Sequence, residues 1–253
     1  MEYSLISFDE YKNCKNIAEQ ILWDSAKYSH KDMEKLRAPD IINMLNYKYS
    51  PNVAIYYSDH VGIADGSTCV DRMNEYLDIK GIYLRVRRSI KLDDIFVETV
   101  SGMTAFNDGK KPTMFLNINN CFNRMLFTML HEFTHMYQAE HRSAYYMQAL
   151  AMINRDKISG NAYPDELKLV EDEANTVASL LLLPDHQIDK DIRQLSYDAL
   201  RSKYNMSCAG LFNRLRSYFY YDKELDEYEA SQLLYAFRLH KPKFATYINK
   251  YLD

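Results

Sequence analysis

The stretch His131-Glu132-Phe133-Thr134-His135 has the form H-E-x-x-H, and the interpretation of the whole 253-residue chain starts from it. In a helix, residues four positions apart are separated by about 400° of rotation, so both imidazoles leave the same face one turn apart. That spacing lets two ring nitrogens reach one zinc ion at roughly 2.0–2.1 Å each. Glu132 stands where such sites carry the general base that acts on the metal-bound water. The motif therefore predicts a zinc site on a helix, with His131 and His135 as ligands.

The flanking sequence favours a helix buried inside a domain. Apolar side chains recur at helical spacing through the motif. They are Phe122, Met125, Leu126, Met129, Leu130, Phe133, Met136 and Tyr137. Residues 113–118, directly before this helix, are rich in strand-forming residues and predict a strand. We expect that strand to pair with an extended substrate through main-chain hydrogen bonds.

A third protein ligand is expected, because catalytic zinc usually has three protein ligands and a water. The stronger candidate is Glu171, 36 residues after His135, in a segment of the form E-x-x-A-N. Val170 and Ala174 flank Glu171 with apolar side chains, which favours an inward orientation over a solvated acidic face. Asn175, one turn later, is expected to hydrogen-bond the far nitrogen of a ligand histidine.

His141 is the alternative third ligand. With the motif it completes H-E-x-x-H-x-x-x-x-x-H, the ligand spacing of the metzincins. Those enzymes have a glycine where this chain has Gln138, and the glycine lets their chain leave the helix. If the helix continues instead, His141 lies about 15 Å along its axis from His131 and cannot share the ion.

Composition limits the remaining choices. A hydrophobic content of 47% is ordinary for a globular core, and a net charge of −4 provides no global basic field for nucleic acid or membrane. The cysteines form no C-x-x-C pair, which fits a reducing compartment and argues against a cysteine metal site. The sequence shows neither a secretory signal nor an apolar run long enough to span a bilayer. We therefore expect a cytoplasmic protein, with no membrane partner.

The rest of the chain predicts further elements on both sides of the motif. Helices are expected in residues 8–48, with a break near Pro39, and strands at 53–58 and 82–88. Residues 93–100 are a strand or a short loop in this interpretation. A turn is expected at Asn107-Asp108-Gly109, and a helix start at Pro164. Beyond residue 190, the pattern indicates a helix from Tyr197 to Tyr204, a turn, and a Ser207-capped helix to Arg216, followed by an aromatic C-terminal cap that includes Tyr235, Phe237, Phe244 and Tyr247.

Three strings carry a resemblance to a known family. The first is Phe127-Thr128-x-x-His131-Glu132-Phe133-Thr134-His135; the second is Glu171-x-x-Ala174-Asn175-x-x-Ala178-x-x-Leu181-Leu182-Leu183-Pro184; the third is Tyr204-Asn205-Met206-Ser207 with Leu211 and Arg214-Leu215 downstream. They resemble the motifs F-T-x-x-H-E-L-G-H, E-x-x-A-N-x-F-A-x-x-L-L-M-P and F-x-V-S with a later R-L of the ImmA/IrrE family of zinc peptidases. The chain departs from the family at Thr134, Val177 and Leu183, none of which is a catalytic group.

The resemblance implies a fold, a site and an activity. The fold is α+β and zincin-like, with a small twisted sheet packed on the active-site helix and helices at both ends. The ligands are His131, His135 and Glu171, and Glu132 is the base of a zinc-dependent endopeptidase. Family members on mobile elements are typically antirepressors, so the implied substrate is a helix-turn-helix repressor. We expect a helical region with a strand at 1–75, the catalytic core at 76–190 and a helical region at 191–253.

Two other functions remain open at this point. A zinc-containing regulator could use the same site without cleaving anything. Alternatively, the hairpin at 195–216 could bind DNA as a helix-turn-helix, with phosphate contacts from Arg201, Lys203, Arg214 and Arg216. The acidic net charge favours a packed hairpin over DNA binding, so nucleic acid is not the expected partner.

Overall fold

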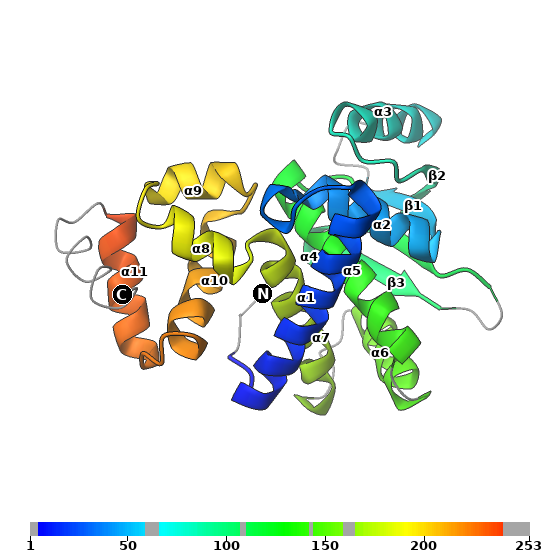
Figure 1. The fold of residues 1–253 in the computed structure, drawn as a ribbon. Coiled ribbons are helices and arrows are strands. Elements are labelled where there is room, and N and C mark those ends of the chain that lie inside the picture. Colours follow the sequence, from blue (N-terminus) through cyan, green and yellow to red (C-terminus); the bar gives the residue numbers. More distant parts are fainter. Residues whose placement is uncertain (1–4, 59–65, 107–109, 142–143, 159–164, 240–253) are drawn as a thin grey trace.

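The computed structural model is an α+β fold in which helices surround a small sheet, as the sequence predicts (Figure 1). The structure describes residues 5–58, 66–106, 110–141, 144–158 and 165–239. The expected turn at Asn107-Asp108-Gly109 and the expected helix start at Pro164 lie outside these residues, as do Phe244 and Tyr247. The strands of the described residues are β1 (Asn52–Tyr57), β2 (Val86–Lys91), β3 (Gly102–Ala105) and β4 (Thr113–Asn117).

Strand order places β3 at one edge of the sheet. The order is β2-β1-β4-β3, with β1 parallel to both of its neighbours and β3 antiparallel to β4. The expectation that the strand at 113–118 pairs with a substrate is therefore wrong, because β4 already has a strand on each side. The edge next to the motif helix belongs to β3 instead.

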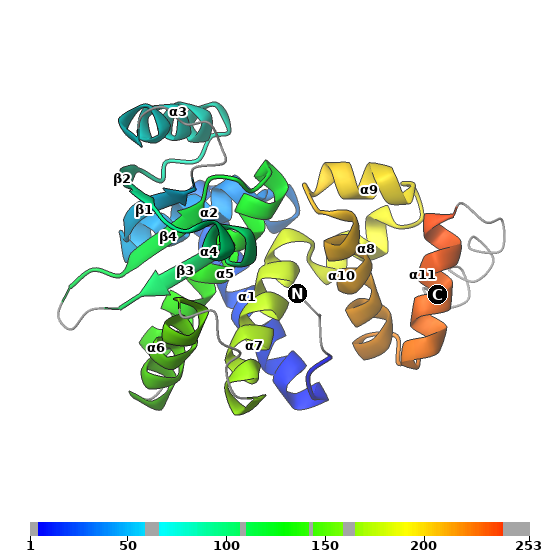
Figure 2. The ribbon, with the colours of Figure 1, turned by 180° about the vertical axis from the view of Figure 1, so that it is seen from behind.

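The two faces of the sheet pack against different helices, because successive side chains of a strand point to opposite faces. Val53, Ile55, Met114 and Leu116 join the main core with α5 (Phe122–His141), the helix that carries the motif. On the other face, Tyr56 and Phe115 pack with Phe96 and Val97 of α4 (Asp94–Thr99). The sheet thus lies between α5 and the short helix α4 (Figure 2).

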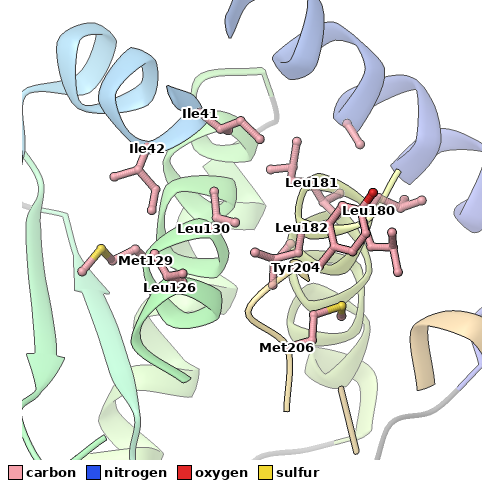
Figure 3. Packing of buried hydrophobic residues seen from close by; sticks show 14 of the residues in the cluster. Ile41, Ile42, Leu126, Met129, Leu130, Leu180, Leu181, Leu182, Tyr204 and Met206 are labelled. Carbon is pink, nitrogen blue, oxygen red and sulfur yellow. The ribbon is translucent and has the colours of Figure 1, made fainter. Parts of the chain in front are cut away.

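The motif helix packs against α2 (Ala38–Tyr49) and α7 (Asp165–Leu182), and α1 (Phe8–Ser29) packs in turn against these two helices. Figure 3 shows apolar residues of this core from α2, α5, α7 and the segment after α9 (Tyr197–Lys203). Those labelled are Ile41, Ile42, Leu126, Met129, Leu130, Leu180, Leu181, Leu182, Tyr204 and Met206. The helical spacing of apolar residues along α5 therefore correctly predicted a buried helix.

Several expected boundaries differ from the structure. The segment expected as a strand or a short loop at 93–100 contains the helix α4 instead, because the Asp93 side chain accepts a hydrogen bond from the Phe96 amide and caps it. The strand expected at 82–88 begins later, as β2. The helices α3 (Gly66–Ile79), α6 (Ala144–Ile158) and α8 (Asp185–Asp191) have no counterpart in the sequence analysis. Pro39 lies in the first turn of α2, where its missing N–H costs nothing.

The C-terminal helices form a cluster at the end of the molecule away from the sheet (Figure 1). They are α8 (Asp185–Asp191), α9, α10 (Cys208–Tyr221) and α11 (Glu227–Arg238). The expected hairpin is confirmed: Ser207 caps α10 by accepting a hydrogen bond from the Gly210 amide at 2.9 Å. The proposed division of the chain near residues 75 and 190 stays a prediction. No helix in the described residues combines the length and the apolar character needed to cross a membrane.

Candidate metal centre

Helix α5 directs the two motif histidines at one point. Both side chains are buried, and their Nε2 atoms lie 3.0 Å apart with the rings perpendicular. This is the geometry that helical spacing of four residues predicts, and it depends only on local structure. Thr134, between them, is also buried, and its hydroxyl donates to the Leu130 carbonyl at 2.8 Å. The β-branched residue that replaces the family's glycine is therefore accommodated within the helix.

Helix α7 brings Glu171 to the same point from the opposite side. One carboxylate oxygen lies 3.5 Å from Nε2 of His131, and the other lies 3.5 Å from Nε2 of His135. Glu171 is 4% exposed. One ligand atom from each of the three residues lies within 4.8 Å of the others. The structure thus assembles the three residues that the sequence analysis chose.

His141 does not take part in this cluster. It ends α5, its side chain is half exposed, and its Nδ1 hydrogen-bonds the Tyr137 carbonyl one turn earlier. The helix continues through Gln138, where the metzincin pattern would need a glycine. The distance argument made from the sequence therefore applies, and Glu171, not His141, completes the cluster of three possible donors.

The donor set and its spacing fit a zinc ion. Three donors about 2.1 Å from a tetrahedral ion lie roughly 3.4 Å from one another. The separations among the three side chains, 3.0, 3.5 and 3.5 Å, are close to that value. Two imidazoles and one carboxylate also form the ligand set of several catalytic zinc sites.

The electrostatic surroundings favour the protonation states that bind a metal. Burial by itself raises the pKa of the Glu171 carboxyl. The Lys157 ammonium, whose Nζ lies 2.9 Å from Oε1 of Glu171, and the two histidines outweigh burial and hold this pKa well below its ordinary value. For His135, burial lowers the pKa and favours the neutral imidazole. A carboxylate and a neutral imidazole are the forms that donate an electron pair to a cation.

Glu132 is buried beside the cluster, and β3 orients it. The Thr104 hydroxyl donates to its Oε2 at 2.8 Å. Gly102 allows this close approach, because a Cβ at that position would lie 2.3 Å from Cγ2 of Thr128 and 3.2 Å from Oε1 of Glu132. The edge strand therefore packs directly against the motif helix.

A cleft of about 520 Å³ opens onto these groups. His131, Glu132 and Glu171 line it, together with Gly102 of the edge strand. Two cationic side chains, Arg124 and Lys157, also reach the cleft. Two of the predicted ligands, His131 and Glu171, and the predicted base thus line one cleft, which α4 also borders.

The far nitrogen of His135 has a partner that the sequence analysis missed. Its Nδ1 lies 2.8 Å from the hydroxyl of Tyr146, which donates to Oε1 of Gln138 at 2.5 Å. Asn175, which we expected in such a role, is buried and lines the cleft near His131. Its hydrogen bond to a ligand histidine stays a prediction.

Helix α6 shows which sequence signal was overlooked. Tyr146, Ala149, Leu150 and Ile153 recur at helical spacing and form a buried cluster. This pattern could have predicted the helix. No local pattern, however, says that the Tyr146 hydroxyl reaches the motif or that Lys157 reaches Glu171, because both contacts depend on how α6 packs against α5 and α7.

Together, the antiparallel edge strand, the motif helix and the carboxylate from α7 form a zincin-like arrangement with three donors that could hold a metal ion. Residues 76–216 match the IrrE N-terminal-like domain, a peptidase family. The match covers more than half of the chain, and the protein belongs to this family. No curated protein and no solved structure matches the chain. The resemblance found in the three sequence strings is therefore confirmed.

Proposed function

We propose that this protein is a zinc-dependent endopeptidase, in which His131, His135 and Glu171 hold the ion and Glu132 is the general base. The observation that carries this proposal is the position of the Glu132 carboxylate. It is buried next to a three-donor cluster and lines the same open cleft. A purely structural zinc site normally has four protein ligands and needs neither the cleft nor the extra carboxylate.

The zinc ion and the side chains of the protein would have different roles in such a reaction. When bound, zinc supplies Lewis-acid chemistry, because it lowers the pKa of a water and polarises the peptide carbonyl. Glu132 accepts the proton of the attacking water and delivers it to the leaving amine. Thr104 holds Oε2 of Glu132, while Oε1 lies beside Gly102 at the wall of the cleft.

The backbone of β3 offers a place for an extended substrate. In an antiparallel pair, the backbone N–H and C=O groups of every second residue face the neighbouring strand. The Ser101 carbonyl faces β4 and accepts a hydrogen bond from the Asn117 amide, so the amide and carbonyl of Gly102 point away from β4. The next outward carbonyl, that of Thr104, accepts a hydrogen bond from Asn154 at 2.7 Å. A peptide that enters the cleft would therefore pair with Gly102, directly beside the base.

A protein substrate fits the shape of the site. A second cavity of about 90 Å³ shares Arg124 and Phe127 with the cleft and reaches Met206 and Gly210 at the start of α10. A substrate polypeptide bound in the cleft could thus extend towards the C-terminal helices. Together with the resemblance to antirepressors, this supports a regulatory protein as substrate, such as a helix-turn-helix repressor.

DNA binding by the C-terminal hairpin is less well supported. Arg214, one of its four expected phosphate contacts, is fully buried and hydrogen-bonds the Leu183 carbonyl at 2.8 Å. Lys203 forms an ion pair with Asp191 at 2.5 Å. Arg214 therefore does not reach a phosphate as the DNA-binding alternative requires, and the hairpin packs on the rest of the molecule.

Replacing Glu132 by glutamine tests the proposed activity. Zinc-loaded wild type and Glu132→Gln would be incubated with a proteome-derived peptide library, and new termini identified by mass spectrometry. The variant should keep its zinc and lose cleavage by a factor of about 10²–10⁴, the usual contribution of a general base. Equal cleavage by both proteins, or no cleavage by zinc-loaded wild type, contradicts the proposal. The second outcome would favour a non-proteolytic zinc regulator.

A further inference from the structure

We propose that Tyr146, Gln138 and Glu173 form a directed hydrogen-bond chain that keeps the proton of His135 on Nδ1 and leaves Nε2 ready for zinc. The inference rests on the proposed zinc site, but it assigns a positioning role to three residues outside the ligand set. Each residue comes from a different helix: Gln138 from α5, Tyr146 from α6 and Glu173 from α7.

This series of hydrogen bonds begins at the carboxylate of Glu173 and ends at the imidazole of His135. Nε2 of Gln138 donates to Oε2 of Glu173 at 3.2 Å. Oε1 of Gln138 accepts from the Tyr146 hydroxyl at 2.5 Å, and that hydroxyl lies 2.8 Å from Nδ1 of His135. All four side chains are at most 3% exposed, so water does not compete for these contacts.

The direction of the hydrogen bonds follows from the chemistry of the carboxylate. A carboxylate only accepts, so the NH₂ group of Gln138 must face Glu173 and its oxygen must face Tyr146. The single hydroxyl proton of Tyr146 is then donated to Gln138. The Tyr146 oxygen can therefore only accept from His135, which places the imidazole proton on Nδ1 and the lone pair on Nε2.

The other motif histidine has no such support. Nδ1 of His131 is buried and has no hydrogen-bond partner in the described part of the chain. Because His135 carries its proton on Nδ1, the 3.0 Å contact between the two Nε2 atoms requires a proton from His131. Before zinc binds, the two ligands thus differ in tautomer, and His135 is already in the form that coordinates a metal.

Two substitutions test different parts of this hydrogen-bond chain. Tyr146→Phe removes the oxygen that accepts from His135. Glu173→Gln keeps the size of the side chain but can donate, which allows Gln138 to turn over and the chain to reverse. Tyr197→Phe is the matched control, since it removes another tyrosine hydroxyl, which donates to the Cys208 carbonyl outside the metal centre.

The first readout is zinc affinity, measured by competition with a chromophoric chelator. Loss of the partner of a metal-bound histidine typically weakens metal binding about 10- to 100-fold. We expect that loss for Tyr146→Phe, a smaller one for Glu173→Gln and none for Tyr197→Phe. Zinc affinity of Tyr146→Phe and Glu173→Gln within about twofold of wild type overturns the inference.

The second readout is independent of zinc and of activity. In the metal-free protein, ¹⁵N NMR of the histidine side chains distinguishes protonation at Nδ1 from protonation at Nε2. Wild type should show His135 protonated at Nδ1, and Glu173→Gln should show a mixture of both forms. A wild-type His135 protonated at Nε2 overturns the inference even if Tyr146→Phe does not fold.

These results separate the inference from the proposed function. If wild type binds zinc and cleaves peptides while the variants behave like wild type, only the hydrogen-bond chain is wrong. If wild type shows the expected tautomer but never cleaves a peptide, the positioning chain stands and the peptidase proposal fails.

Discussion

Thr104 holds the carboxylate that we propose as the base, yet no sequence pattern singles this residue out. The position of the two proposed histidine ligands was predictable for a local reason: helical spacing alone brings His131 and His135 together at 3.0 Å. Glu171 was predictable because apolar neighbours turn it inward. Thr104 contacts Glu132 across 28 positions of sequence, and such contacts depend on the packing of the whole domain.

Substitution of Thr104 should change the chemical step more than binding. Thr104→Val removes the hydrogen bond to Glu132 without a large change in shape, so the carboxylate loses its fixed orientation. We expect kcat of peptide cleavage to fall about tenfold, equivalent to ~1.4 kcal/mol, with KM nearly unchanged. Thr104→Ser, which keeps a hydroxyl, should retain most of the activity. Equal losses in both variants would contradict this role.

At the scale of elements, the sequence predicted individual helices and strands better than it predicted which of them lie side by side. It correctly placed a strand directly before the motif helix, because that strand has a local apolar pattern. It did not reveal β3, which is only four residues long. The order of strands in the sheet is a non-local property, and for this reason β4 was wrongly expected to be the edge that pairs with a substrate.

The approach of β3 to α5 can be tested at Gly102. In Gly102→Ala, the new methyl group would lie 2.3 Å from Cγ2 of Thr128, so the strand must shift away from the helix. We expect a loss of roughly 1–3 kcal/mol in the free energy of unfolding, measured in urea, together with weaker peptide cleavage.

The control for Gly102→Ala is a second substitution, at Thr128 of α5, whose side chain the new methyl group would meet. Thr128→Ser removes the methyl group but keeps the hydroxyl that donates to the Arg124 carbonyl. Combined with Gly102→Ala, it should restore part of the lost stability. Full stability of the single Gly102→Ala variant would show that the strand and the helix are not in tight contact.

On the scale of the whole molecule, a partly buried ionic cluster joins the C-terminal helices to the rest of the chain. Arg214 of α10 forms an ion pair with Asp185 at the start of α8. Lys15 of α1 bridges Asp185 and Asp222 at 2.7 and 2.6 Å. Arg214 was placed at a surface only in the DNA-binding alternative, and no local pattern in the sequence indicates that this charged residue is buried.

The cluster predicts a pH-dependent stability. Burial by itself raises the pKa of Asp185, but Arg214 and Lys15 outweigh it and hold the pKa below the ordinary value of 3.8. Because the folded pKa is the lower one, the contribution to stability is present above about pH 4 and is lost as the pH falls through the folded pKa. Asp185→Asn should therefore cost about 3 kcal/mol at pH 7 and less at pH 3.

Urea unfolding of wild type and Asp185→Asn at both pH values measures this effect. Asp32→Asn is a suitable control, because Asp32 pairs with Lys35 on the exposed surface and should contribute little. The same difference between wild type and Asp185→Asn at pH 7 and at pH 3 would contradict the assignment.

The central claim is that His131, His135 and Glu171 bind a single zinc ion, and metal content tests it most directly. Wild type, Glu171→Ala and His141→Ala would be equilibrated with one equivalent of zinc, desalted and analysed by atomic emission. We predict that wild type and His141→Ala retain the ion, whereas Glu171→Ala, although folded by circular dichroism, loses it. Full retention of zinc by Glu171→Ala, or its loss from His141→Ala, would contradict the account.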